Sequence, residues 1–375
     1  MEGEALEERP DPENGGVPPF VGDLDVGWIC GSRSPRHRTD PPIQVHRYDD
    51  RTYILRQSKD VSYEAPFMYL MFGNEKAILL DTGATTDPLR FPLRTTVDRL
   101  MEGYAADHPG QAHELIVAHT HGHGDHVAGD GQFADRPGTK VVSKDVDSVR
   151  SFYKISSWSE GIGHCDLGGR QLDVLPTPGH HPSAVAIHDS RTGMLLTGDT
   201  VYPGRLYAFD PNAFADSMER LVSFAGAREV SHVMGCHIEM TRTPRKDYPV
   251  GTRYQPDEPP LQMTMGQLVS VKEAAASIKG RSGRYVFDDF AIYNFPCRRA
   301  LMASMVRGLG RNFRYQLGLS QAGLRRQRVS GSCYVKNCGP GMDQFGHLCN
   351  PHAEEARAGS QTWRRGYLRW SFWRP

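Results

Sequence analysis

The stretch THGHGDHVAG, residues 120–129, places three histidines and one aspartate within the six positions from His121 to His126. It follows the apolar run LIVA at 115–118, which is typical of a short buried strand. Histidine is the commonest metal ligand in proteins. Alternate residues leaving a strand can point the same way, so we expect His121 and His123 to share one ion, with Asp125 and His126 turned toward a second. The alternative is a solvated polar loop.

The other ligands of such a site must come from elsewhere, because one loop cannot enclose two ions. Three further strand ends carry a suitable side chain. His180 follows a predicted strand at 171–175, Asp199 follows one at 194–197, and His237 follows one at 232–234. Strands that each end in a turn bearing His or Asp can gather these residues at one edge of a sandwich.

The remaining pattern predicts sheets that are covered by helices on their outer faces. Two hairpins come first, and helices and single strands then alternate. The predicted strands cover 43–48, 52–56, 67–72, 76–80, 140–143 and 184–188, the predicted helices cover 88–106, 213–224 and 262–279, and a final strand or helix edge covers 284–293.

Five segments together resemble the metallo-β-lactamase superfamily of metallohydrolases. They are LLDTG at 79–83, THGHGDHVAG at 120–129, TPGHHPSAV at 177–185, LLTGDTVY at 195–202 and GCH at 235–237, in the order that the family has. The resemblance covers roughly residues 43–240. It implies an α+β fold, a four-layered αββα sandwich over residues 43–295 with the metals at one edge.

The resemblance also implies a ligand set. His121, His123 and His180 would hold the first ion, Asp125, His126 and His237 would hold the second, and Asp199 would bridge them. Asp81 would orient the ligand loop, as carboxylates beside such sites commonly do. His119 lies outside the motif, and His181 is expected to point away from the metals.

The implied chemistry is hydrolysis by a water that two divalent ions activate, with Asp125 or a metal-bound water protonating the leaving group. Zn²⁺ is the expected metal, while Fe and Mn stay open. Zinc β-lactamases generally lack an aspartate where Asp199 stands, so antibiotic hydrolysis is not expected. The match is closer to the glyoxalase-II-like and lactonase-like branches, whose substrates are small esters, thioesters or lactones. HIEMTRTPRKDYP at 237–249, however, does not resemble the glutathione-binding tail of glyoxalase II.

Two other activities of the same superfamily are alternatives. A persulfide-type dioxygenase uses one iron and fewer ligands, and a metal-dependent nuclease would use two zincs. The full ligand set argues against the first, and the lack of recognisable clamp segments argues against the second.

Two Pro- and Tyr-rich segments, 202–212 and 238–262, follow metal-bearing strands and lie where substrate loops are expected. Their candidate substrate-binding residues are Tyr202, Arg205, Tyr207 and Arg242. Ordinary loop roles are the alternative for all four.

The N-terminal and C-terminal segments of the chain differ in sequence pattern from residues 43–295. Residues 1–42 lack periodicity and are expected to be irregular. Residues 296–375 contain 14 Lys or Arg against 3 Asp or Glu and are expected to form a basic, poorly ordered extension. Contact with nucleic acid is the less favoured role for this extension. Its Cys333, Cys338, His347 and Cys349 have spacings unlike common zinc knuckles.

No signal-like segment begins the sequence, and no apolar run reaches the roughly 20 residues of a membrane helix. The seven cysteines are an odd number and widely spread. We therefore expect a cytoplasmic, soluble protein with reduced thiols, a small-molecule substrate and no membrane partner. The oligomeric state is not predicted.

Overall fold

Strand β3 (Phe67–Phe72) is buried on both faces in the computed structural model, which describes residues 19–109, 114–158 and 160–317. Its odd-numbered side chains, from Phe67 to Met71, pack into one hydrophobic core. Its even-numbered side chains, from Met68 to Phe72, pack into another. Successive side chains of a strand point to opposite faces. The sheet that contains β3 therefore has a core on each side.

This first sheet has six strands in the order β1-β2-β3-β4-β5-β6. Its strands are β1 (Ile43–Arg47), β2 (Thr52–Gln57), β3, β4 (Lys76–Leu80), β5 (Glu114–Ala118) and β6 (Thr139–Val141). The hairpin strands β1 to β4 are antiparallel, and β5 and β6 join them in parallel. Helix α1 (Leu93–Asp107) buries Leu93, Val97, Met101 and Tyr104 against the outer face.

The second sheet also has six strands, in the order β13-β12-β10-β9-β8-β7. They are β7 (Gly163–Asp166), β8 (Gln171–Pro176), β9 (Val185–Asp189), β10 (Met194–Gly198), β12 (His232–Gly235) and β13 (Gln262–Met263). Helices α4 (Pro211–Gly226) and α5 (Met265–Ser277) cover its outer face. They share a core with Leu195 of β10 and Val233 of β12.

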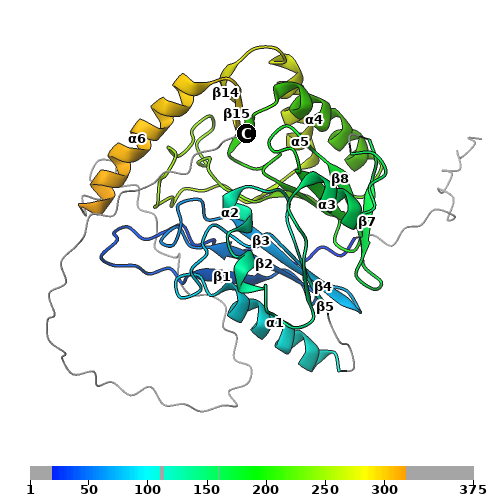
Figure 1. The fold of residues 1–375 in the computed structure, drawn as a ribbon. Coiled ribbons are helices and arrows are strands. Elements are labelled where there is room, and N and C mark those ends of the chain that lie inside the picture. The colour runs from blue at the N-terminus through cyan, green and yellow to red at the C-terminus, as the bar shows by residue number, and fades with distance from the viewer. Residues whose placement is uncertain (1–18, 110–113, 159, 318–375) are drawn as a thin grey trace, which may run out of the picture. The chain divides into compact units, whose positions relative to one another are not determined.

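The largest core lies between the two sheets. It joins Tyr69 and Ile78 of the first sheet to Val174, Ile187 and Leu196 of the second. The layers therefore run from α1 through the two sheets to α4 and α5 (Figure 1). This is the αββα sandwich expected from the sequence, and that prediction is confirmed.

The secondary structure differs from the expectation in two places. The stretch at 262–279, expected as one helix, divides into strand β13 and helix α5, which a Thr264 capping box opens. The stretch at 284–293 forms two strands, β14 (Gly283–Val286) and β15 (Ala291–Asn294). They pair with β11 (Arg205–Ala208) in a third sheet, which the sequence did not predict.

Helix α6 (Arg298–Gln316) lies inside the stretch expected to be poorly ordered. Its large apolar residues recur at helical spacing but are exposed, whereas its buried positions are the small residues Ser304 and Gly308. The Cys333–Cys349 group lies outside the described residues. Two short helices, α2 (Gly124–Val127) and α3 (Val146–Phe152), follow strands of the first sheet. Among the described residues, no helix is both long and apolar enough to cross a membrane.

Arg170 ties the two sheets together at one end of the sandwich. It lies in the β7–β8 turn, and its guanidinium donates to both carboxylate oxygens of Asp189 on β9, at 3.0 and 2.6 Å. It also donates to the carbonyl oxygens of Arg51 and Phe72, at 2.9 and 3.2 Å. Burial alone would raise the pKa of Asp189, but the charge of Arg170 outweighs it and lowers that pKa. Both side chains are buried, so each charge depends on the other.

Replacing Arg170 with Met should therefore lower the free energy of unfolding by about 3–5 kcal/mol, because Asp189 would keep a buried charge without a partner. Arg228→Met is the matched control. It removes a more exposed ion pair with Asp173, at 2.9 Å, and should cost about 1 kcal/mol or less. Urea denaturation measures both variants, and equal losses would contradict the role given to Arg170.

Candidate metal centre

The histidine loop leaves the first sheet at the end of β5. Residues 115–118 are buried, and the chain then turns through His121 and His123 into helix α2. His123 is in an extended conformation immediately before α2, and Asp125 and His126 lie in its first turn. The four side chains therefore lie at one edge of the first sheet, facing the strand ends of the second.

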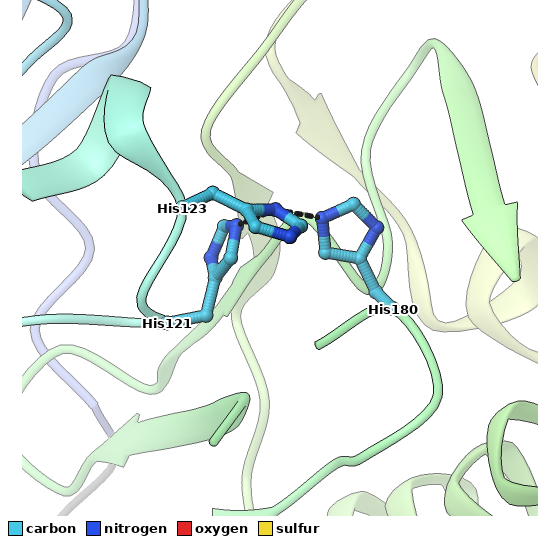
Figure 2. A group of neighbouring side chains, drawn as sticks. All are labelled: His121, His123 and His180. Atoms are coloured by element: carbon cyan, nitrogen blue, oxygen red, sulfur yellow. Dashed lines mark hydrogen bonds between the residues drawn. The ribbon is translucent and has the colours of Figure 1, made fainter. Parts of the chain in front are cut away.

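Three histidines form the first group of donor atoms. His121 Nε2 lies 2.9 Å from His123 Nδ1, which lies 2.9 Å from His180 Nε2 (Figure 2). His180 comes from the β8–β9 loop. The preceding Gly179 has a positive φ of 135°, and a Cβ there would lie 2.4 Å from Cα of Phe214. Glycine is therefore required for the loop that brings His180 to the other two.

The surroundings of these imidazoles disfavour their protonated form. Burial and neighbouring histidines hold the pKa of His121 well below its ordinary value and lower that of His123 to about 2. His123 Nδ1 faces two other nitrogens, and a pair of neutral imidazole nitrogens can share only one proton. A cation at the point where the three nitrogens converge would satisfy all of them, and neutral imidazole is a common ligand of Zn²⁺.

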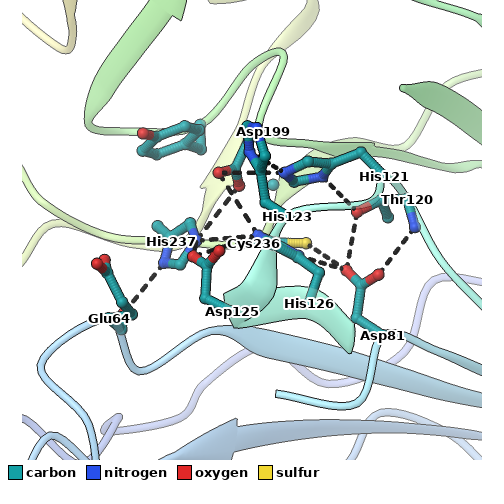
Figure 3. Close-up of polar contacts among 12 residues, drawn as sticks. Glu64, Asp81, Thr120, His121, His123, Asp125, His126, Asp199, Cys236 and His237 are labelled. Atoms are coloured by element: carbon teal, nitrogen blue, oxygen red, sulfur yellow. Dashed lines mark hydrogen bonds and ion pairs between the residues drawn. The ribbon is translucent and has the colours of Figure 1, made fainter. Parts of the chain in front are cut away.

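The second group consists of Asp125, His126, Asp199 and His237, whose donor atoms all lie within 4.8 Å of one another (Figure 3). Asp125 Oδ2 is 3.5 Å from His126 Nε2 and 3.4 Å from His237 Nε2. Asp199 follows β10, and His237 follows β12. All three strand ends predicted from the sequence thus meet the histidine loop.

This second group has a strongly negative field. Burial would lower the pKa of His126, but Asp125 and Asp199 outweigh it and raise that pKa well above its ordinary value. His237 is also buried, yet Asp199 and Asp125 raise its pKa to about 9. The field that favours a proton on these imidazoles would equally favour a metal cation in its place.

Asp199 lies between the two groups. Its Oδ2 is 3.9 Å from His121 Nε2, 3.5 Å from His180 Nε2 and 3.5 Å from His126 Nε2. Its Oδ1 is buried and lies 3.3 Å from His237 Nε2, which is an ion-pair contact, but it accepts no hydrogen bond within the described part of the chain. A buried carboxylate oxygen without a hydrogen bond is costly unless a cation is beside it. The donor atoms of both groups therefore fit a divalent cation, and Asp199 lies within reach of both groups.

The second ring nitrogens of four histidines are held by the surrounding chain. His126 Nδ1 donates to Asp81 Oδ2 at 2.9 Å. His180 Nδ1 lies 3.0 Å from the Tyr207 carbonyl oxygen, and His237 Nδ1 lies 3.0 Å from that of Glu64. His121 Nδ1 is 3.2 Å from the Thr120 hydroxyl. Such contacts fix the tautomer and the ring orientation, so that each Nε2 faces the centre with its lone pair.

Two neighbouring histidines lie outside both groups. His119 Nε2 contacts Asp130 Oδ1 at 2.8 Å instead, in agreement with its predicted exclusion. His181 was expected to point away, and this was wrong. Its ring packs edge-on against that of His123 at 4.6 Å, while its Nδ1 accepts a hydrogen bond from the Ser183 amide at 3.1 Å.

Two of the predicted substrate-binding residues are part of the scaffold. Arg205 is buried, pairs with Glu239 and donates to the Tyr248 carbonyl oxygen at 2.5 Å. Tyr202 is buried and donates to the Arg205 carbonyl oxygen. Neither presents its polar group to a substrate, so we withdraw both. The hydroxyl of Tyr207 accepts from Arg205 at 3.0 Å, whereas Arg242 is exposed.

Two residues beside the site were not singled out from the sequence. Phe209 is 38% exposed, and its ring lies 5.6 Å from that of His180 and 6.1 Å from that of His123. It belongs to the predicted substrate segment 202–212, which was the available signal. Cys236 Sγ donates to Asp81 at 3.3 Å. Burial raises the pKa of this thiol, so it acts as a neutral donor rather than a thiolate.

Comparisons with known proteins find a family match in the central part of the chain. Residues 64–242 match the family model described as the metallo-beta-lactamase superfamily. The hydroxyacylglutathione hydrolase of Anaeromyxobacter dehalogenans (strain 2CP-C) is 37% identical over 86 residues, which are 23% of this chain and 32% of that protein. The chain spans about a third to a half of the length of the first curated relatives it matches.

Two other relatives match over a longer range. The hydroxyacylglutathione hydrolase of Synechococcus sp. (strain JA-3-3Ab) is 29% identical over 56% of this chain and 77% of its own length. The acyl-coenzyme A thioesterase MBLAC2 of Bos taurus is 25% identical over 46% of this chain and 72% of its own length. The family match spans both donor groups and most of both sheets, and residues 64–242 are a domain of the metallo-beta-lactamase superfamily.

Proposed function

We propose that the protein is a dinuclear metal-dependent hydrolase of small esters, thioesters or lactones. The observation that carries this proposal is the shared position of Asp199, within 3.9 Å of imidazole nitrogens from both donor groups. His121, His123 and His180 would hold one ion, and Asp125, His126 and His237 the other. The preferred metal is Zn²⁺, because five of the seven ligands are imidazoles, with Fe or Mn as alternatives.

Two divalent ions in such a site supply a water of lowered pKa and polarise the bond to be cleaved. The protein's own side chains supply the rest. The two aspartates and five histidines hold the centre, and Asp81 fixes the orientation of His126. The side chain of Asp125 is 20% exposed, whereas that of Asp199 is 8% exposed. Asp125 is therefore the ligand best placed to pass a proton to a leaving group.

A thioester is the substrate class with most support. Two relatives that match over more than 200 residues are named as a hydroxyacylglutathione hydrolase and an acyl-coenzyme A thioesterase, and the substrates in both names are thioesters. Phe209 places an exposed aromatic ring next to the first histidine group, where it can contact the apolar part of an acyl chain. The segment after His237 does not resemble a glutathione-binding tail, which favours a different thiol carrier.

His123→Ala should remove bound metal and hydrolytic activity together, because it deletes the nitrogen that faces both other histidines of the first group. Elemental analysis of the purified protein should give about two zinc ions per chain for the wild type and fewer for the variant. His164→Ala is the matched control, since His164 is an exposed histidine paired with Asp173 outside the site. Full activity in His123→Ala would contradict the ligand assignment. A content of one iron ion per chain would favour the persulfide dioxygenase.

Asp81→Asn should weaken metal retention by about 10- to 100-fold, a typical effect of losing a hydrogen-bond partner of a ligand. The amide nitrogen cannot accept the proton of His126 Nδ1, so the ring loses its orientation. Competition with a chelator measures this without any substrate. Unchanged metal affinity would contradict the orienting role of Asp81.

Phe209→Ala should raise KM for long-chain acyl thioesters by about tenfold, which corresponds to one lost apolar contact. Acetyl thioesters, which do not reach the ring, should be affected much less. The measurement is a series of thioesters of increasing chain length, run beside lactones and a phosphodiester. Equal effects at every chain length would argue against an acyl-binding role for Phe209, and preferential phosphodiester cleavage would favour the nuclease.

A further inference from the structure

Helix α6 exposes an apolar stripe. Met302, Val306, Leu309 and Phe313, with Leu317 directly after the helix, recur at spacings of three and four residues. Residues at this spacing lie on one face of an α-helix. All five are between 49% and 65% exposed. A continuous row of large apolar side chains that is exposed to solvent indicates an interaction surface for a protein, a membrane or a ligand.

The opposite face of α6 is attached to the sandwich by small residues. The Val250 amide donates to the Ser304 hydroxyl at 3.4 Å, and Asn312 donates to the Gly251 carbonyl oxygen at 2.6 Å. Gly308 packs so closely that a Cβ would lie 1.7 Å from the Val250 oxygen. The helix is therefore held along one face, and the stripe faces away from the residues that hold it. Figure 1 shows α6 along the margin of the described fold.

The helix is also strongly basic. Its 19 residues contain five arginines and no acidic residue. Arg311 lies on the attached side, with its guanidinium 5.4 Å from the centre of the Tyr248 ring. At 100° per residue, Arg298 and Arg299 border the stripe on its two sides, and Arg307 and Arg314 follow farther round the surface. Positive charge thus surrounds an exposed apolar face.

We propose that α6 binds the surface of an anionic lipid bilayer, lying in its plane with the stripe in the acyl boundary and the arginines at the headgroups. This combination of an apolar face with a basic polar face is the one that interfacial helices use. The inference does not depend on the proposed catalytic function. It replaces the expectation of no membrane partner with contact at the surface, without a membrane-spanning segment.

Other occupants fit the same observations less well. A second copy of α6 would bring four outward arginines near four others without a carboxylate in either helix, and like charges repel. Nucleic acid would pair with the arginines but leave the apolar stripe in water. A protein clamp that encloses a basic helix would have to detach the Ser304 face first. An anionic bilayer can bind to the exposed face of α6 without any rearrangement of the helix.

The position of α6 relates this surface to the candidate metal centre. The helix begins three residues after Phe295, whose ring lies 4.5 Å from that of Phe209. Phe209 in turn lies beside His180 and His123. A bilayer on α6 would therefore lie close to the aromatic side of the metal centre.

The test is co-sedimentation of the full-length protein with vesicles of phosphatidylcholine alone or with added phosphatidylserine. The wild type should bind the mixed vesicles and bind phosphatidylcholine far more weakly. Arg307→Gln combined with Arg314→Gln should weaken binding to the mixed vesicles about 30-fold. Leu309→Gln combined with Phe313→Gln should weaken binding to them about 100-fold.

Val21→Gln is the matched control, because Val21 is 59% exposed but lies outside α6. It should bind as the wild type does, and circular dichroism should show that all variants are folded. Absence of wild-type binding, or equal binding to both kinds of vesicle, would overturn the proposal. It would also be overturned if ultracentrifugation found a dimer that the Leu309/Phe313 pair dissociates, because a second copy would then cover the stripe.

Discussion

The carboxylate of Asp81 is the interaction on which the metal centre most depends. Its Oδ1 accepts the Thr120 amide at 2.8 Å, and its Oδ2 accepts the Thr120 hydroxyl at 2.8 Å and the His126 ring at 2.9 Å. The Cys236 thiol also donates to Oδ2. One fully buried side chain thus joins the ends of β4, β5 and β12, which belong to both sheets. Without the Asp81 carboxylate, the groups that donate hydrogen bonds to it would be buried without an acceptor, which would lower the stability of the fold.

Asp81 adopts a positive φ of 68°, a conformation that is uncommon for a residue other than glycine. Its amide donates to the Ala118 carbonyl oxygen at 2.8 Å, and the next amide, that of Thr82, donates to the His126 carbonyl oxygen at 2.7 Å. These bonds hold the backbone in a sparsely populated region. Such conformations persist where the surroundings determine them strongly, and they cluster at functional sites.

The two donor groups differ in charge although they are adjacent. Three neutral imidazoles make up one, while two carboxylates dominate the field of the other. Asp199 connects them, because its two carboxylate oxygens lie within 3.9 Å of imidazole nitrogens from both groups, and added positive charge would be stabilised there. The sandwich provides this arrangement at one edge, where loops from both sheets meet above a rigid core. Helix α6 attaches a basic, apolar surface to the same scaffold without changing that core.

The sequence by itself determined the fold class and placed histidine and aspartate side chains, which can bind metals, at the strand ends. The strand before His121 and the turns bearing His180, Asp199 and His237 were readable because each combines a short apolar run with a polar turn at fixed spacing. Successive side chains of β3 pack into different cores, and this alternation likewise follows from strand geometry. These are local patterns, and all the information for them lies within a few residues.

Only the tertiary structure decided which polar groups remain available to a ligand. Tyr202 and Arg205 looked like substrate residues, but Glu239 and Tyr248, 34 and 43 positions beyond Arg205, occupy its guanidinium. Helix α6 was not recognised because its apolar residues face solvent, while its buried positions are Ser304 and Gly308, whose role depends on the close approach of Val250. Hydrogen bonds and packing between distant segments have no local signature, because they depend on distances that exist only once the chain has folded.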